Sequence, residues 1–331
     1  MVNANVNFDT VSIYALTVCD AADVLRLSQA VDDRDVYGRE APIEVTIRKA
    51  QNLRIAIPSA KDLEFFGNEE AMRYVAQAGA KAAESAADAA TDVKFVVTML
   101  PVGANVCSVL QEAGVIDAVA PDTVLIDAST IDVDTARAMR EAVTDAGYEF
   151  LDAPVSGGVG GAEAGTLTFM CGGDPKVFLK CRPILEGMGK NIVMCGGPGQ
   201  GQVTKICNNM IAGITALACS EAFVLGETLG VDRKTLFDVI STSSGNSAVL
   251  NMMCPVSGVT SNAPANNDYK PGFAAGLMLK DLRLAQAAAL SVGTSTPLGA
   301  VAAAAFAIHD ANGHSHLDTS SIIKLIKPDI E

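Results

Sequence analysis

From residue 67 onward, apolar and polar positions follow a regular rhythm that predicts alternating strands and helices. Three continuous apolar runs are typical of buried parallel strands, namely residues 93–100, 123–129 and 148–155. Other segments carry apolar positions at helical spacing, namely residues 69–78, 85–90, 104–112 and 132–146. Strands and helices of these lengths favour a parallel sheet that is covered by helices on both faces.

The pattern becomes wholly helical near residue 200. Two further strands are expected at residues 165–173 and 192–197, with a helix at 174–187 between them. Only helical patterns follow, at residues 203–229, 233–241, 279–291 and 297–311. We therefore predict an α/β domain at residues 67–197 and an all-helical domain at residues 198–331. Ligands of such sheets bind beyond the carboxyl ends of the strands.

Residues 1–66 do not share this rhythm. They hold one glycine, Gly38, and many interspersed charges. Short strand-like runs occur at residues 43–47 and 53–57, without a regular alternation of strand and helix. We treat residues 1–66 as an anomalous N-terminal segment in which a first strand–helix–strand unit is atypical or missing.

Composition excludes several classes of partner. The 331 residues carry a net charge of −14 and no basic run, which argues against nucleic acid and anionic membrane surfaces. No uninterrupted apolar run reaches the roughly 18 residues of a membrane span. The eight cysteines form no C-x-x-C pair, which is typical of reduced, buried thiols. His314 and His316 stand close in sequence, but no cysteine or carboxylate cluster joins them, so we expect no metal site.

The most informative stretch is GQGQVTKICNNM, residues 199–210. A glycine-rich turn leads into an apolar helical pattern in which Lys205 and Asn209 stand four residues apart, on one helix face. Burial disfavours the charged form of a lysine, which lowers its pKa and suits it to proton transfer. The alternative is a lysine whose stem packs on apolar neighbours while its head reaches water.

A second glycine-rich stretch follows the strand at residues 148–155. Ser156, Gly157 and Gly158 offer a hydroxyl group and unobstructed backbone N–H groups, which suit a carboxylate. The alternative is a loop without a ligand. The position at the end of a strand favours binding.

Several motifs, in order, resemble one enzyme family. DAPVSGGVGGAEAGTLTFMCGG (residues 152–173) resembles the substrate signature of the β-hydroxyacid dehydrogenases, and GQGQVTKICNNM resembles their catalytic helix. LP at Leu100 and Pro101 and DASTID at residues 127–132 are similar to their cofactor-side loops. SSG (243–245), PANNDYKPGF (264–273) and LMLKDLRLA (277–285) are similar to the 3-hydroxyisobutyrate dehydrogenase branch. The resemblance covers residues 67–326 and implies a Rossmann-like domain followed by an all-α domain.

The resemblance also implies roles for individual residues. Lys205 would be the general acid–base, and Asn209 would hold the substrate oxygen. Ser156, Gly157 and Gly158 would bind the substrate carboxylate. The residues implied at the NAD site are Leu100, Pro101, Asn105, Thr130 and Lys280. Asp281 is interpreted as a surface charge of a helix and receives no role.

The implied reaction is the reversible NAD-dependent oxidation of 3-hydroxyisobutyrate to methylmalonate semialdehyde, a step of valine and branched-chain amino acid catabolism. The family also implies a homodimer or homotetramer, located in the mitochondrial matrix of a eukaryote or in the cytoplasm of a bacterium. The first 20 residues contain Asp9 and Asp20 but no arginine or lysine, so they do not resemble a secretory signal or an import presequence.

One family feature is missing from the sequence. A G-x-G-x-x-G turn, which lets the backbone approach a pyrophosphate, is expected near residues 39–50, but REAPIEVTIRKA there has no glycine. The acidic residue that would bind the ribose is expected near position 66, and that position is a phenylalanine, Phe66. Three explanations compete: a frame error upstream of residue 67, a homologue that has lost its cofactor and binds a small acid, or cofactor binding by another surface. A reductase of another small semialdehyde is a further alternative. With residues 1–66 as written, we predict weak or absent NAD⁺ binding.

Overall fold

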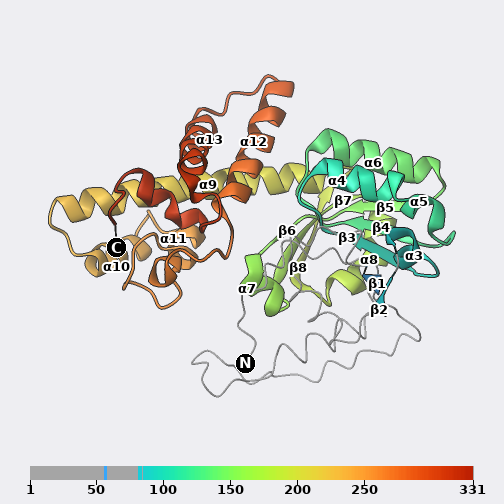
Figure 1. Ribbon diagram of the computed structural model, residues 1–331, viewed down its shortest axis with the longest axis horizontal. Coiled ribbons are helices and arrows are strands. Elements are labelled where there is room, and N and C mark those ends of the chain that lie inside the picture. The colour runs from blue at the N-terminus through green and yellow to red at the C-terminus, as the bar shows by residue number, and fades with distance from the viewer. Residues whose placement is uncertain (1–55, 58–80, 84, 331) are drawn as a thin grey trace, which may run out of the picture. The chain divides into compact units, whose positions relative to one another are not determined.

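The computed structural model describes residues 56–57, 81–83 and 85–330, and the chain divides after Lys205 into two compact units (Figure 1). The expected helix at residues 69–78 and the strand-like run at 43–47 lie outside the described residues. Strands β1 (Ala56–Ile57) and β2 (Lys81–Ala82) form a two-stranded parallel sheet.

Three predicted strands lie side by side and parallel in a six-stranded sheet of the first unit. β3 (Phe95–Thr98), β4 (Val124–Asp127) and β5 (Glu149–Asp152) are neighbours in that order. Thr98 lies opposite Asp127, which lies opposite Asp152. Three polar side chains thus meet at the carboxyl edge of the sheet, where ligands bind in folds of this class.

The rest of the sheet departs from the wholly parallel arrangement that the sequence pattern favoured. The expected strand at 148–155 is split, because β5 is followed by a separate short strand, β6 (Val155–Ser156). β7 (Leu167–Gly173) runs antiparallel to both β5 and β6, and β8 (Gly189–Gly196) runs parallel to β7. The connection between β6 and β7 is too short for the crossover of a dozen or more residues that a parallel neighbour needs.

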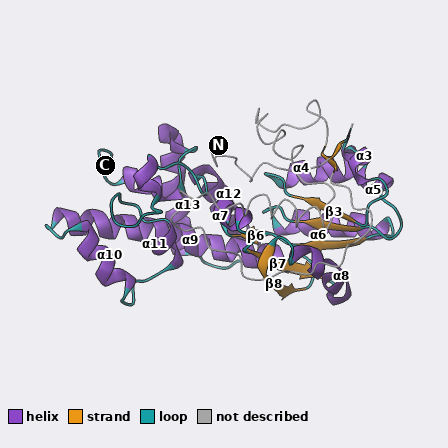
Figure 2. Ribbon diagram, turned by 90° about the horizontal axis from the view of Figure 1, so that it is seen from below, coloured by secondary structure: helices purple, strands orange, loops and turns teal. Residues whose placement is uncertain are grey.

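Alternating residues of the strands supply two separate cores. Val96, Leu125 and Phe150 pack on one face of the sheet, and the next residues along each strand pack on the other. Helices flank the strands (Figure 2). The first core includes α3 (Ala86–Ala90), α4 (Gly103–Cys107), α5 (Val115–Ala118) and α6 (Val133–Asp145), and the second includes α8 (Pro175–Leu185). A π-helical turn at Ser108–Glu112 continues α4.

The long helix α9 (Gln200–Thr228) begins in the first unit and continues through the second. By length and hydropathy alone it would suffice to cross a membrane, with a mean hydropathy of 1.4. Core helices of globular domains meet the same two criteria, so this is weak support for a span. Ala216 and Phe223 of α9 belong to the buried cores of the second unit.

The described part of the second unit contains helices and short helical turns. They are α10 (Arg233–Ser241), α11 (Ala248–Met252), a 3₁₀ turn at Pro264–Asn267, α12 (Ala275–Ser291), α13 (Pro297–His309), a π turn at Asp310–His314 and a 3₁₀ helix at Thr319–Leu325. α9 and α12 approach closely at Gly213, where an added Cβ would lie 3.1 Å from Leu282.

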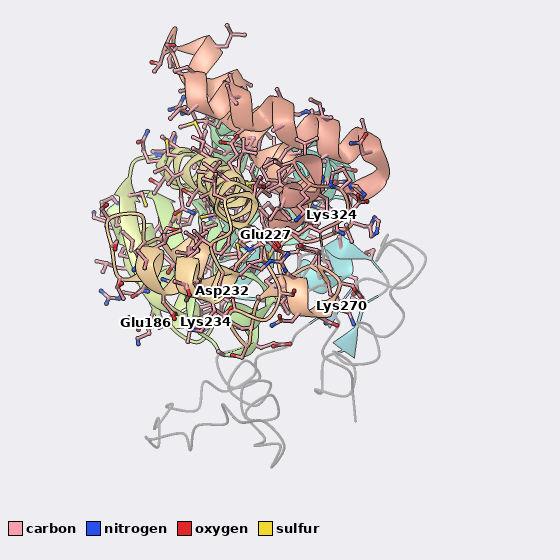
Figure 3. The ribbon with its side chains drawn as sticks, turned by 90° about the vertical axis from the view of Figure 1, so that its left-hand side faces the viewer. Glu186, Glu227, Asp232, Lys234, Lys270 and Lys324 are labelled. Atoms are coloured by element: carbon pink, nitrogen blue, oxygen red, sulfur yellow. The ribbon has the colours of Figure 1, made fainter. Side chains whose placement is uncertain are left out.

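Ion pairs fix the C-terminal end of α9. Glu227, which Figure 3 labels, accepts hydrogen bonds from Arg233 at the start of α10 and from Lys327 near the end of the chain, each at 2.8 Å. The Lys327 bond, followed by the charge of Arg233, lowers the pKa of Glu227. One carboxylate therefore joins three segments of the helical unit.

Candidate active site

The first turn of α9 is hydrogen-bonded to Asp152, the last residue of β5. Asp152 accepts hydrogen bonds from the backbone N–H groups of Gly199 at 2.8 Å and Gln202 at 3.2 Å. It thereby satisfies donors that the start of a helix leaves unpaired. Burial raises the pKa of Asp152 to about 6, and these backbone bonds oppose the rise. Gly201 is required for the close contact, because a Cβ there would lie 2.2 Å from the Met170 carbonyl oxygen.

Lys205 and Asn209 follow on the next two turns of α9. Lys205 is 6% exposed and Asn209 is 4% exposed. The lysine side chain therefore lies inside the protein and does not extend into solvent, which disfavours the surface-lysine alternative. Because they stand four positions apart on a continuous helix, both side chains lie on the same face.

Asp281 on α12 holds Asn209 in place. Asn209 Nδ2 donates to Asp281 Oδ2 at 2.5 Å, and Lys280 Nζ lies 3.2 Å from Asp281 Oδ1. Asp281 is only 1% exposed, so its interpretation as a surface charge was wrong. The sequence did contain the signal: Asp281 shares the helical spacing of the buried Met278, Leu282 and Ala285.

The loops that follow β3 and β4 are tied together by Ser129. Its hydroxyl oxygen accepts from the Leu100 N–H at 2.7 Å, and its hydroxyl donates to Asp127 Oδ1 at 2.5 Å. Thr98 also donates to Asp127 Oδ1, at 2.9 Å. Burial raises the pKa of Asp127 to about 6. These bonds bring the predicted cofactor residues Leu100 and Thr130 to one edge of the sheet.

The other predicted cofactor residues lie on different elements. Pro101 is half-buried in the loop after β3, and Asn105 is exposed on α4. Lys280 lies on α12 in the helical unit. The two loops at the sheet edge contain hydroxyl and backbone groups and no lysine or arginine, a donor set that fits an uncharged ribose and carboxamide. The segment in which the pyrophosphate turn was expected lies outside the described residues.

The serine–glycine stretch begins a short helix. Ser156 ends β6, and α7 (Gly158–Glu163) starts two residues later. Gly157 and Gly158 have φ angles of 142° and 60°, which side-chain-bearing residues rarely adopt. This backbone requirement accounts for both glycines, and carboxylate binding remains a prediction.

The histidines near the C-terminus have structural neighbours. His309 Nε2 lies 2.7 Å from Ser321 Oγ, and the rings of His309 and His314 are 4.7 Å apart. Burial lowers the pKa of His309 to about 4. Within the described residues, no group of three or more histidine, cysteine, aspartate or glutamate side chains could hold a metal ion.

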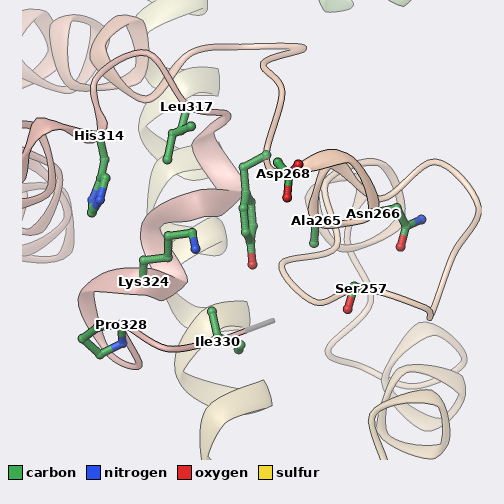
Figure 4. A pocket seen from close by; sticks show the side chains of 10 residues that line it. Ser257, Ala265, Asn266, Asp268, His314, Leu317, Lys324, Pro328 and Ile330 are labelled. Atoms are coloured by element: carbon green, nitrogen blue, oxygen red, sulfur yellow. The ribbon is translucent and has the colours of Figure 1, made fainter.

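A cavity of about 810 Å³ in the helical unit contains none of the predicted site residues (Figure 4). Tyr269, His314 and Lys324 are among its lining residues. Lys324 Nζ lies 5.1 Å from the centre of the Tyr269 ring, a cation–π distance. No residue of α9 is among those that line it.

Two known families match the chain, and the boundary between their matches lies near the boundary between the two compact units. Residues 64–197 match the family described as the NAD binding domain of 6-phosphogluconate dehydrogenase. Residues 199–326 match the family described as NAD-binding of NADP-dependent 3-hydroxyisobutyrate dehydrogenase.

Individual proteins support the same assignment. The chain is 47% identical to 3-hydroxyisobutyrate dehydrogenase of Pseudomonas aeruginosa over 262 residues, 78% of this chain and 88% of that protein. It is 41% identical to NAD-dependent L-serine dehydrogenase of the same organism over 261 residues, again 78% and 88%. The structure of Mycobacterium tuberculosis 3-hydroxyisobutyrate dehydrogenase with L-serine superposes with a TM-score of 0.74 at 42% identity, covering 79% of this chain and 89% of that one. The chain therefore belongs to the 3-hydroxyisobutyrate dehydrogenase family of NAD(P)-dependent 3-hydroxyacid dehydrogenases.

Proposed function

We propose that the protein oxidises 3-hydroxyisobutyrate to methylmalonate semialdehyde with NAD⁺, and that Lys205 is its general acid–base. The observation that carries this proposal is the buried Lys205 one helical turn from Asn209, whose amide is held by Asp281. General acid–base catalysis needs a titratable side chain within hydrogen-bond reach of the reacting proton, and Lys205 is a buried titratable side chain on this helix.

The protein residues divide the chemical tasks. The neutral amine of Lys205 accepts the hydroxyl proton as the C3–H bond breaks and the carbonyl forms. Asn209 holds the reacting oxygen, and Ser156, Gly157 and Gly158 hold the carboxylate. When bound, the nicotinamide supplies the acceptor for the hydride that leaves C3. Leu100, Pro101, Asn105, Thr130 and Lys280 are the residues that we assign to the cofactor.

L-Serine is a second candidate substrate. It shares the carboxylate and the hydroxymethyl group of 3-hydroxyisobutyrate and differs by an ammonium group in place of a methyl group. The 41% identity to an L-serine dehydrogenase and the relative solved with L-serine favour this candidate. A buried ammonium group needs a hydrogen-bonding or charged partner, and a methyl group does not. A substrate pocket that binds one of the two acids well is therefore expected to bind the other less well.

Initial rates with a set of acids test the proposal. We expect kcat/KM to be higher for 3-hydroxyisobutyrate than for L-serine, and to be lost for the methyl ester of 3-hydroxyisobutyrate, which has no carboxylate charge. Each acid is assayed with NAD⁺ and with NADP⁺, because the matching families are described with both cofactors. A preference for L-serine would contradict the substrate assignment, and full activity with the ester would contradict the carboxylate site.

Further parts of the proposal concern the cell. We assign the reaction to valine catabolism, in the mitochondrial matrix of a eukaryote or in the cytoplasm of a bacterium. A homodimer or homotetramer is supported by exposed apolar side chains on α12 and α13, such as Leu290 at 84% and Leu298 at 66% exposure. Light scattering by the purified protein measures the number of subunits.

A further inference from the structure

Gln202, in the first turn of α9, is completely buried. Its side-chain Nε2 donates to the Ser129 carbonyl oxygen at 2.7 Å, and its Oε1 accepts from the Ile131 N–H at 3.1 Å. One amide group therefore makes two hydrogen bonds to the loop that follows β4. The buried backbone groups of Ser129 and Ile131 would lose these partners if the amide were removed.

The loop that Gln202 binds carries a residue assigned to the cofactor. Thr130 lies between the two bonded residues. The Ser129 hydroxyl in turn binds the Leu100 N–H, so the same amide also supports the loop after β3. On the helix side, Lys205 follows Gln202 by three residues, which places it less than one helical turn away.

We propose that Gln202 is a positioning residue that fixes the Ser129–Ile131 loop to the helix that carries Lys205. This inference rests on the proposed function, because it concerns how the cofactor-side loop and the acid–base are held in register. Gln202 makes its contacts through the backbone of the loop and acts on the reaction through Thr130 and Lys205.

Replacing the amide without changing its size provides the first test. Gln202→Met keeps a similar shape and removes both hydrogen bonds. Gln200→Met is the matched control, because Gln200 lies in the same turn and its Cγ would be 3.2 Å from a Cβ added at Gly196. We expect Gln202→Met to accelerate hydrogen–deuterium exchange at Ile131. We also expect the KM for the cofactor to rise by about 10- to 100-fold, the effect of losing one or two buried hydrogen bonds, while the KM for the acid changes little.

A second variant distinguishes positioning from general stability. In Gln202→Glu, the protonated carboxyl can still donate to Ser129 and accept from Ile131, whereas the carboxylate cannot donate. Two carboxyl groups lie near position 202. Asp152 accepts from the backbone N–H of residue 202, and Asp127 accepts from the Ser129 hydroxyl. The negative charge of either one favours the protonated form of the new glutamate. The kcat/KM for the cofactor, relative to wild type at each pH, should approach wild type at low pH and fall by about tenfold per pH unit above the pKa of the new glutamate.

The outcomes separate this inference from the proposed function. Faster exchange at Ile131 in Gln202→Met, with a raised cofactor KM and recovery of Gln202→Glu at low pH, supports the assignment. Unchanged exchange overturns it, as does faster exchange with unaltered kinetic constants. A wild-type protein that oxidises none of the acids refutes the proposed function, and the exchange result alone then decides whether Gln202 fixes the loop.

Discussion

At the scale of single residues, Asn209 and Asp281 determine each other's orientation. Asn209 donates to a carboxylate that is 1% exposed and that also pairs with Lys280. An amide that must hold a substrate oxygen gains a fixed direction from such a bond, because a hydrogen bond to a charged group is stronger than one between neutral groups. In the proposed reaction, Asp281 would therefore act through Asn209 and Lys280.

Removing that carboxylate should slow the reaction. We expect Asp281→Ala to lower kcat by about 10- to 100-fold, since a hydrogen bond to a charged group contributes about 1.5–3 kcal/mol. Asp238→Ala is the control, because Asp238 is an exposed carboxylate that pairs with Lys234 on α10. Steady-state kinetics and the melting temperature of both variants check the prediction. An unchanged kcat in Asp281→Ala would show that Asn209 is held by other contacts.

Asp127 should make stability depend on pH. Burial raises its pKa to about 6, above the 3.8 of an unperturbed aspartate. The folded state therefore favours the protonated carboxyl, and this contribution is present below pH 3.8 and is lost as the pH rises through about 6. Asp127→Asn removes the titration. Urea unfolding should show the wild type losing on the order of 3 kcal/mol relative to this variant between about pH 4 and pH 7. A constant difference across that range would contradict the assignment.

At the scale of elements, the start of α9 depends on glycine. A Cβ added at Gly201 would lie 2.2 Å from the Met170 carbonyl oxygen of β7 and 2.6 Å from Asp152 Oδ2 at the end of β5. A side chain at this place would push the helix away from the sheet, and with it the turn that carries Lys205. Gly201 in the first turn of α9 therefore has a packing function.

A methyl group at Gly201 tests this packing. We expect Gly201→Ala to lower the free energy of unfolding by at least about 1–3 kcal/mol, because a Cβ would clash with backbone atoms. Gly197→Ala is the matched control: a Cβ at Gly197 meets no atom within 4 Å. Urea denaturation of both variants measures the difference. Equal stability would show that α9 can shift without cost.

Local signals predicted several elements well. α10 begins and ends at the expected residues, and α6 begins directly after Asp132, because aspartate side chains cap both helices. The reversal at β7 was not predicted, since strand direction depends on pairing between distant segments. The short helices α5, α7 and α11 were also missed, because four to six residues carry too little periodicity to be recognised.

At the scale of the whole molecule, motifs located most of the candidate site but not its supporting residues. Lys205 and Asn209 stood out because a lysine in an apolar helix is unusual. Asp281 and Gln202 did not, because their importance lies in hydrogen bonds to residues some 70 positions away in sequence. The partners in such contacts follow from the fold, and the local pattern indicates only that Asp281 shares the buried face of its helix.

The N-terminal sequence should limit cofactor affinity. Residues 1–66 contain one glycine, and a pyrophosphate needs several exposed backbone N–H groups at a glycine-rich turn. We expect the 331-residue protein to bind NAD⁺ more weakly than micromolar. Isothermal titration calorimetry measures this, with NADP⁺ in a parallel titration. A micromolar dissociation constant would show that the chain binds the pyrophosphate without this turn.

Formation of reduced nicotinamide, followed by its absorbance, tests whether the protein is an NAD⁺-dependent dehydrogenase with Lys205 as its general acid–base. Wild-type protein and Lys205→Ala are compared with 3-hydroxyisobutyrate and millimolar NAD⁺, which compensates for weak binding. We expect turnover by the wild type and a loss of about 10²- to 10⁴-fold in Lys205→Ala, the contribution of a general acid–base. An undiminished rate in Lys205→Ala, or a wild type that binds the acid and reduces no cofactor, would contradict this expectation.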